Sequence, residues 1–171
     1  LADCAANRAM GVADWSPDGR FIVYTDWIQL HSQDSPPDTK KTSIWLLDLE
    51  TGASTQVTRP VDEQMYDTGP GFSPDGRRLA IIRGTSSIRN IYSIDFDRDS
   101  LVSHSRQNLE TTQLTHDSAF INQFTWLKNS EGVIFDSNKT GERNLWLLEL
   151  DSLTQKLLGA RDSQSPSLDG A

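Results

Sequence analysis

Cysteines, basic residues and long apolar runs are all scarce in this 171-residue chain. Its one cysteine, Cys4, excludes an internal disulfide and says little about the redox compartment. There are 24 acidic residues against 16 lysines and arginines, giving a formal net charge of −8. Because a nucleic-acid binder needs a cationic surface to displace counterions from phosphates, we expect no direct nucleic-acid binding. No apolar run approaches the roughly 18–20 residues that a spanning helix needs, so we expect no membrane span in this segment.

Signals for helices, catalysis and metal binding are also missing. No segment keeps a 3.6-residue apolar period, which predicts little helix. The chain has no Gly-x-Ser-x-Gly elbow and no nucleophile placed against a base by a motif, so we expect no catalytic residues. His31, His104 and His116 lack zinc-ligand spacing, and the alternating acids at 95–99 lack the glycine and glutamate of a calcium loop. We therefore expect no metal ion and no cofactor.

What the sequence does contain is a repeat. Residues 15–24 read Trp-Ser-Pro-Asp-Gly-Arg-Phe-Ile-Val-Tyr, and residues 72–81 read Phe-Ser-Pro-Asp-Gly-Arg-Arg-Leu-Ala-Ile. A degenerate third copy occupies 126–135, and a fourth begins at Pro166. A second motif follows each complete copy, as Ile-Trp-Leu-Leu-Asp-Leu at 44–49 and its relatives at 91–96 and 145–150. Tandem units of this size predict a repeat architecture rather than one irregular domain.

Each unit is predicted to fold as four strands. The first strand ends at the aromatic residue before Ser-Pro-Asp-Gly, which is a tight turn because Pro presets φ and Gly accepts a positive φ. A β-branched run then forms the second strand, and the Trp-Leu-Leu run forms the third. The polar turn Glu50-Thr51-Gly52 leads into a short fourth strand.

Ser-Pro-Asp-Gly after an aromatic residue, followed by an apolar strand and Ile-Trp-x-x-Asp-Leu, resembles the repeats of the TolB-like, WD-like β-propeller family. The resemblance runs from about Gly11 onward and departs from the pattern at 127–131, where the Pro-Asp pair is missing. It implies an all-β fold, a partial β-propeller of three four-stranded antiparallel blades plus the first strand of a fourth. The expected ranges are a tail at 1–10, blades at 11–58, 66–115 and 119–159, and a truncated fourth blade at 163–171.

Three blades do not close a ring, because propellers have four to eight. The chain is therefore expected to be a fragment of a longer propeller or to pair with a second copy. A homodimer of two three-blade halves would complete a six-blade ring.

The resemblance also implies where a ligand would bind, since the loops joining strands two and three, and strand four to the next blade, share the face around the central channel. The insertion that begins at Trp27 combines apolar residues with two prolines, which favours either a partner-binding lip or packing on the adjacent blade. We expect the binding residues to lie among these loops: Trp27, His31, Tyr66, Asp67, His116, Phe120 and Arg161.

These observations favour a non-enzymatic module that binds a protein or a peptide. The resemblance implies a periplasmic or otherwise extracytoplasmic setting, either as a TolB-like protein or as the sensor portion of a membrane-anchored bacterial transcription regulator. The alternative is the gating propeller of a prolyl-oligopeptidase-like serine peptidase, whose hydrolase domain would lie elsewhere in the parent protein.

Overall fold

The computed structural model describes residues 8–29, 40–60, 65–97 and 109–159. Within these ranges the chain forms β-strands and turns and contains no helix. The strands are β1 (Arg8–Trp15), β2 (Phe21–Gln29), β3 (Lys40–Asp48), β4 (Ser54–Gln56), β5 (Tyr66–Phe72), β6 (Arg78–Gly84), β7 (Arg89–Asp95), β8 (Thr112–Gln113), β9 (Ile121–Trp126), β10 (Gly132–Ser137), β11 (Asn144–Glu149) and β12 (Thr154–Gly159).

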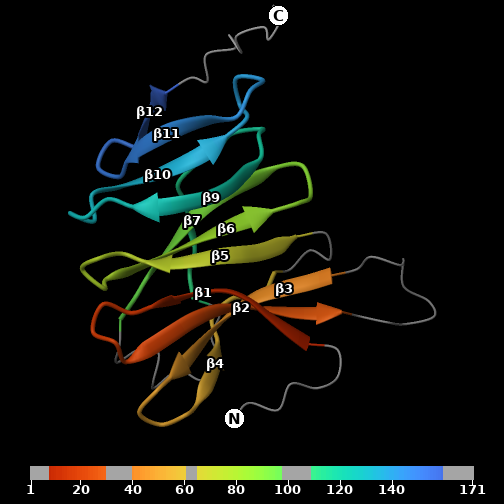
Figure 1. Cartoon of the computed structure of the whole chain (residues 1–171), viewed down its shortest axis with the longest axis vertical. Coiled ribbons are helices and arrows are strands. Elements are labelled where there is room, and N and C mark those ends of the chain that lie inside the picture. Colours follow the sequence, from red (N-terminus) through yellow and green to blue (C-terminus); the bar gives the residue numbers. More distant parts are fainter. Residues whose placement is uncertain (1–7, 30–39, 61–64, 98–108, 160–171) are drawn as a thin grey trace, which may run out of the picture.

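The twelve strands form three sheets of four, each an antiparallel meander in chain order. The sheets stack one on another, and the first strand of each, β1, β5 and β9, lies along the same side of the stack (Figure 1). This arrangement is three blades of a β-propeller, and it confirms the predicted fold class. The predicted first strand of a fourth blade, at 163–171, lies outside the described residues.

The Ser-Pro-Asp-Gly turns form as predicted, and their side chains stabilise them. In the first blade the Ser16 hydroxyl donates to Asp18 and accepts from the Phe21 amide at 2.8 Å. Gly19 and its counterpart Gly76 have φ values of 74° and 70°, which only glycine adopts without strain. At the matching place in the third blade stands Ser130, at φ 62°. The third turn therefore has the same geometry despite its different sequence.

The core lies between neighbouring blades rather than within one of them. The first cluster joins the facing sides of blades one and two, where Phe21, Ile44 and Leu46 meet Phe72 and Ile81. A second cluster joins blades two and three around Ile91, Ile121 and Phe135. Since a single four-stranded sheet cannot bury both of its faces, each blade depends on its neighbour for stability.

The first blade is longer than the sequence predicted. β1 begins at Arg8 and so includes the last residues of the expected tail. β2 and β3 continue into the insertion and remain paired as far as Gln29 and Lys40. Trp27 therefore lies in a strand, opposite Thr42, and not in a loop.

Candidate binding surface on the inner strands

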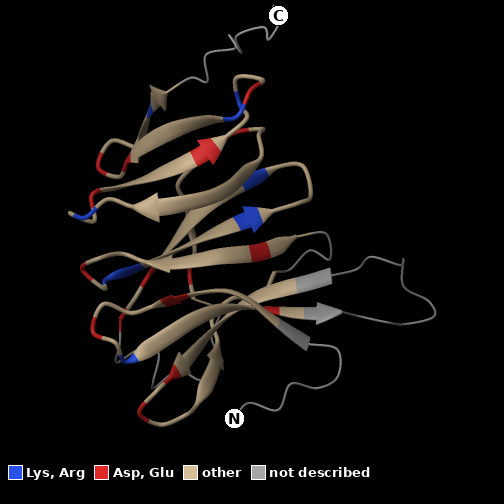
Figure 2. Ribbon diagram, viewed as in Figure 1, with Lys and Arg blue, Asp and Glu red and all other residues tan. Residues whose placement is uncertain are grey.

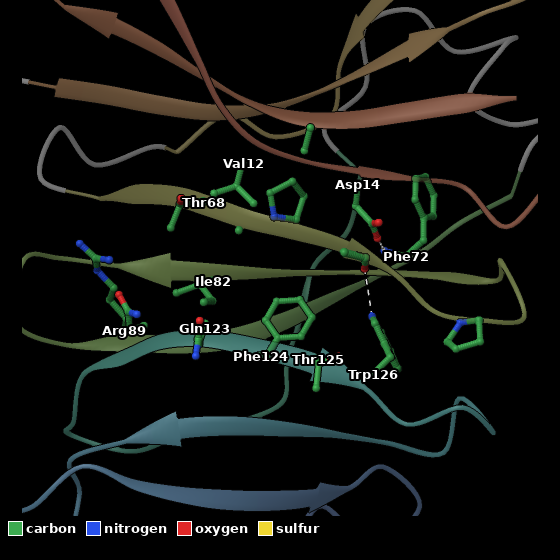
Figure 3. A pocket seen from close by; sticks show the side chains of 16 residues that line it. Val12, Asp14, Thr68, Phe72, Ile82, Arg89, Gln123, Phe124, Thr125 and Trp126 are labelled. Atoms are coloured by element: carbon green, nitrogen blue, oxygen red, sulfur yellow. Dashed lines mark hydrogen bonds between the residues drawn. The ribbon is translucent and has the colours of Figure 1, made fainter. Parts of the chain in front are cut away.

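A hollow of about 710 Å³ runs along the inner strands of the three blades (Figure 3). Its floor is the middle of β5, where Gly69, Pro70 and Gly71 present mostly backbone between the side chains of β1 and β9. Proline is tolerated there because β5 is the edge strand of its sheet. The lining residues labelled in Figure 3 are Val12, Asp14, Thr68, Phe72, Ile82, Arg89, Gln123, Phe124, Thr125 and Trp126.

Hydrogen bonds between blades fix the shape of this hollow at one end. The Asp14 carboxylate accepts from the Phe72 amide at 2.9 Å, which joins blades one and two. The Trp126 indole N–H donates to the Gly71 carbonyl at 3.0 Å, which joins blades two and three. The ring of Phe124 lies so close to Gly71 that a Cβ there would stand 3.3 Å from it. The inner wall is therefore built before any ligand binds, which reduces the entropic cost of binding.

At the other end of the hollow, a second pocket of about 280 Å³ opens between blades one and two. Trp27, Tyr66 and Arg89 line it, together with three hydroxyl-bearing residues, Thr42, Thr68 and Ser86. The Thr42 hydroxyl is buried and has no hydrogen-bond partner within the described ranges. Arg89 also lines the inner hollow, so the two pockets meet at this residue. We call this second pocket the mouth pocket.

Arg89 is held from two sides by blades two and three. Its backbone N–H donates to the Ala119 carbonyl at 2.9 Å, and its Nε donates to the Thr85 carbonyl at 3.0 Å. The guanidinium carbon lies 4.5 Å from the centre of the Phe120 ring, a distance typical of a cation–π contact. Burial lowers the pKa of Arg89 from its ordinary value, and the nearby Tyr66 acts in the opposite direction.

The structure brings together some of the predicted binding residues and separates others. Trp27 and Tyr66 line the mouth pocket, and Phe120 supports Arg89 beside it. His116 is exposed in the segment between β8 and β9 and lines none of the pockets described for these ranges. His31 and Arg161 lie outside the described residues. The binding role of all these side chains stays a prediction.

Asp67, also predicted as a binding residue, lies in the interior instead. Its side chain is fully buried, and both of its oxygens accept from Arg83, at 2.6 and 2.9 Å. Arg83 further donates to Thr111 and lies over the Tyr92 ring. This bidentate pair ties the start of β5 to the end of β6 and has the geometry of a structural clasp.

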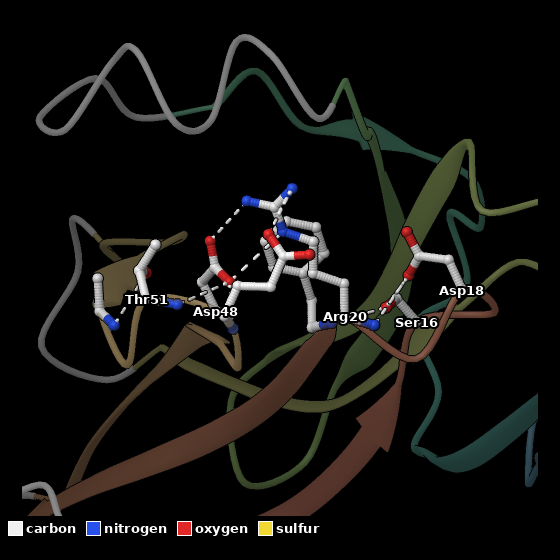
Figure 4. A network of polar contacts seen from close by, with 8 residues as sticks. Ser16, Asp18, Arg20, Asp48 and Thr51 are labelled. Carbon is white, nitrogen blue, oxygen red and sulfur yellow. Dashed lines mark hydrogen bonds and ion pairs between the residues drawn. The ribbon is translucent and has the colours of Figure 1, made fainter.

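Charged groups elsewhere gather at turns and strand ends, as Figure 2 shows. On the end of blade one opposite the mouth pocket, Arg20 donates to the Asp48 carboxylate at 2.9 Å and pairs with Glu50 at 3.2 Å (Figure 4). The hydrogen bond from Arg20, with amide donors from Glu50 and Thr51, lowers the pKa of Asp48 from 3.8 to about 2. This network links the two turns at that end of the blade and stabilises the Asp48 anion.

Sequence reasoning missed three residues that shape the surface. Trp126 carried a usable signal, because it occupies the repeated aromatic position before the turn. Phe124 carried none, since nothing in its own repeat marks it. Arg89 lies in the segment that joins strands two and three of the second blade, on the expected binding face, but nothing in the sequence marks it individually. Their importance comes from neighbouring blades, through Gly71 for the first and Phe120 for the second.

The described part of the chain offers neither a metal-binding cluster nor a membrane-spanning helix. No group of three or more His, Cys, Asp or Glu side chains in these ranges is arranged to hold a metal ion. Across the same ranges, no helix has the length and apolarity to cross a bilayer.

Comparison with known proteins gives two kinds of relative. Dipeptidyl-peptidase 5 of Porphyromonas gingivalis is 32% identical over 146 residues, which cover 82% of this chain and 20% of the relative. The Tol-Pal system protein TolB of Francisella tularensis is 29% identical over 97 residues, or 56% of this chain and 19% of the relative. The crystal structure of TolB from Acinetobacter baumannii aligns with a TM-score of 0.65 at 21% identity, over 90% of this chain and 33% of that one. No family model matches the sequence.

The stacked meanders and their repeated turns define the class: this is an arc of a β-propeller. In sequence and in fold, this arc is similar to TolB. It spans about a fifth of the length of the curated relatives it matches.

Proposed function

We propose that this propeller arc is a non-enzymatic module that binds a polypeptide segment along its inner strands. The observation that carries the proposal is the prebuilt hollow of about 710 Å³, with a backbone floor and aromatic side chains at Phe124 and Trp126. A groove with aromatic sides and a few placed polar groups suits an extended peptide, whose side chains fill it while its backbone meets the polar groups. The similarity to TolB, a protein of the Tol-Pal system, supports a protein partner.

The test is selection from a random peptide library displayed on phage, followed by affinity measurement on purified variants. We expect Phe124→Ala to weaken the selected peptides about tenfold or more, because truncating a central aromatic anchor costs about 2 kcal/mol. The matched control is Leu49→Ala, which truncates an exposed apolar side chain in the β3–β4 turn, away from the hollow. Equal affinities for the two variants would contradict the proposal. Thermal unfolding checks that Phe124→Ala remains folded.

A second candidate function is the gating propeller of a prolyl-oligopeptidase-like serine peptidase. It is favoured by the 32% identity with a dipeptidyl-peptidase over most of this chain. The rest of the parent protein distinguishes the two candidates. An α/β-hydrolase segment with a Gly-x-Ser-x-Gly elbow supports the peptidase, and a winged-helix segment with one membrane span supports the sensor of a transcription regulator.

An extracytoplasmic location, which the resemblance to TolB implies, belongs to the same proposal. We also propose that two copies of the chain assemble into a six-blade ring. Light scattering coupled to size exclusion tests the assembly, and a monomer across a wide concentration range would exclude it.

A further inference from the structure

Among the partly buried arginines of the described residues, three have a pKa shifted from the ordinary value, and their surroundings differ in one respect: Arg20, Arg83 and Arg89. Arg20 pairs with Asp48, and Arg83 pairs with Asp67, and in both cases the carboxylate raises the pKa of the guanidinium. Arg89 has no carboxylate within ion-pair distance among the residues that the structure describes. Because Arg89 is partly desolvated and has no described carboxylate partner, an anionic group of a ligand at the junction of the two pockets would gain a charge-assisted hydrogen bond there.

Two contacts fix the orientation of the Arg89 guanidinium. The Nε is used by the Thr85 carbonyl, and the face of the guanidinium lies against Phe120. In the described ranges no hydrogen bond engages the two terminal amino groups. A guanidinium held in this way presents a parallel pair of N–H groups, which matches the two oxygens of a carboxylate.

We infer that Arg89 is a binding residue for a carboxylate carried by the peptide ligand, seated where the mouth pocket meets the inner hollow. The inference rests on the proposed peptide-binding function and specifies its ligand. Figure 3 places Arg89 at one end of the hollow and Asp14 at the other. Asp14 is engaged by the Phe72 amide, and the described residues that line the mouth pocket include no acid that would repel the ligand.

The surroundings favour a single negative charge over a phosphate. The nearest second cation on the same aromatic ring is Arg143, 5.9 Å from the centre of Phe120. Arg143 is already paired with Asp136 at 3.3 Å and is more than half exposed. One guanidinium with hydroxyl and aromatic neighbours therefore matches a carboxylate, whereas phosphate sites usually gather several donors or cations.

The test uses two pairs of short peptides on the whole chain, followed by NMR. The first pair is acetyl-Gly-Phe-Glu-Gly-amide and its glutamine twin, which probes a side-chain carboxylate. The second is acetyl-Gly-Phe-Gly with a free or an amidated C-terminus, which probes a terminal carboxylate. We expect at least one acidic peptide to bind about tenfold more tightly than its neutral twin and to shift the Arg89 Nε–H resonance.

The preference for the acid should disappear in Arg89→Gln, weaken in Arg89→Lys and remain in the control Arg143→Gln. Acidic and neutral twins that bind the wild type equally, or a preference retained in Arg89→Gln, would overturn the inference while leaving peptide binding intact. If no peptide of either kind binds, the proposed function fails as well. If Arg89→Gln does not fold, the Arg89 Nε–H resonance of the wild type still tests the inference. Acidic peptides must shift this resonance, and neutral peptides must not.

Discussion

At the scale of single residues, the charged groups of this protein divide by the partners they find. Asp67 and Arg83 satisfy each other in the interior, whereas Arg89 is desolvated without a described carboxylate. Asp48 is stabilised as an anion by Arg20 and by backbone donors. The arginines at 20 and 83 therefore stabilise the fold, whereas in our proposal Arg89 recognises a ligand.

The Asp67–Arg83 clasp gives the first residue-scale prediction. Asp67→Asn leaves the Arg83 guanidinium without its counter-ion, so we expect the free energy of unfolding to fall by about 3–5 kcal/mol. Urea denaturation measures the change. The control is Glu149→Gln, which breaks the exposed pair with Lys156 and should cost less than about 1 kcal/mol. Similar losses in the two variants would show that burial of the clasp has no energetic effect.

The depressed pKa of Asp48 predicts a pH dependence of stability. The carboxylate titrates at about 2 in the folded protein and at 3.8 ordinarily, so the folded state favours the anion. Its stabilising effect is complete above the unfolded value and is lost as the pH falls from about 4 to 2. In Asp48→Asn this part of the pH dependence should be absent. Parallel stability curves for the variant and the wild type between these pH values would contradict the assignment.

At the scale of elements, a hydrogen bond between blades explains why the third turn has serine where the first two have glycine. Ser130 adopts the positive φ of its glycine counterparts Gly19 and Gly76, a conformation that is strained for a residue with a Cβ. Its hydroxyl accepts from the Asp75 amide at 3.0 Å, which joins the turns of blades two and three. The hydrogen bond offsets the strain.

Two substitutions at this turn separate the effects. Ser130→Ala keeps the strain and loses the hydrogen bond, so we expect a loss of about 1–2 kcal/mol. Ser130→Gly loses the same bond but relieves the strain, and it should be about 1 kcal/mol more stable than the alanine variant. Thermal unfolding of the two proteins tests the order. If alanine is as stable as glycine, the positive φ carries no cost.

Much of the fold could be predicted from the sequence because its determinants are local. The turn chemistry at 16–19 and the Trp-Leu-Leu runs specify strands within a few residues of themselves. The extension of β2 past Trp27 was missed, since its pairing depends on a partner beyond an insertion. The role of Arg89 was also missed, because it depends on Ala119 and Phe120 of another blade.

At the scale of the whole molecule, the third blade exposes the face that is buried in the first two blades. Ile44 and Ile91 precede the aromatic residue of the third strand and are 0% exposed, whereas Leu145 at the same place is 50% exposed. Leu158 on β12 is also about half exposed, at 51%. Since the first two blades cover this face with the next blade, the third presents a surface shaped for the same kind of cover.

This open face predicts that the chain associates through it at high concentration. Leu145→Ser with Leu158→Ser should shift association to higher concentration while leaving the thermal midpoint nearly unchanged. In contrast, Ile44→Ala at the covered position should lose about 2–5 kcal/mol of stability. Analytical ultracentrifugation and thermal unfolding provide the two readouts. Association unaffected by the double substitution would place the contact elsewhere.

The most direct test of the central claim, that the inner strands bind a polypeptide, is NMR mapping of a library-selected peptide onto the backbone amides. We predict the largest shifts along β1, β5 and β9, including Gly71 and Thr125, which line the hollow. Shifts confined to the outer strands β4, β8 and β12 would contradict the claim.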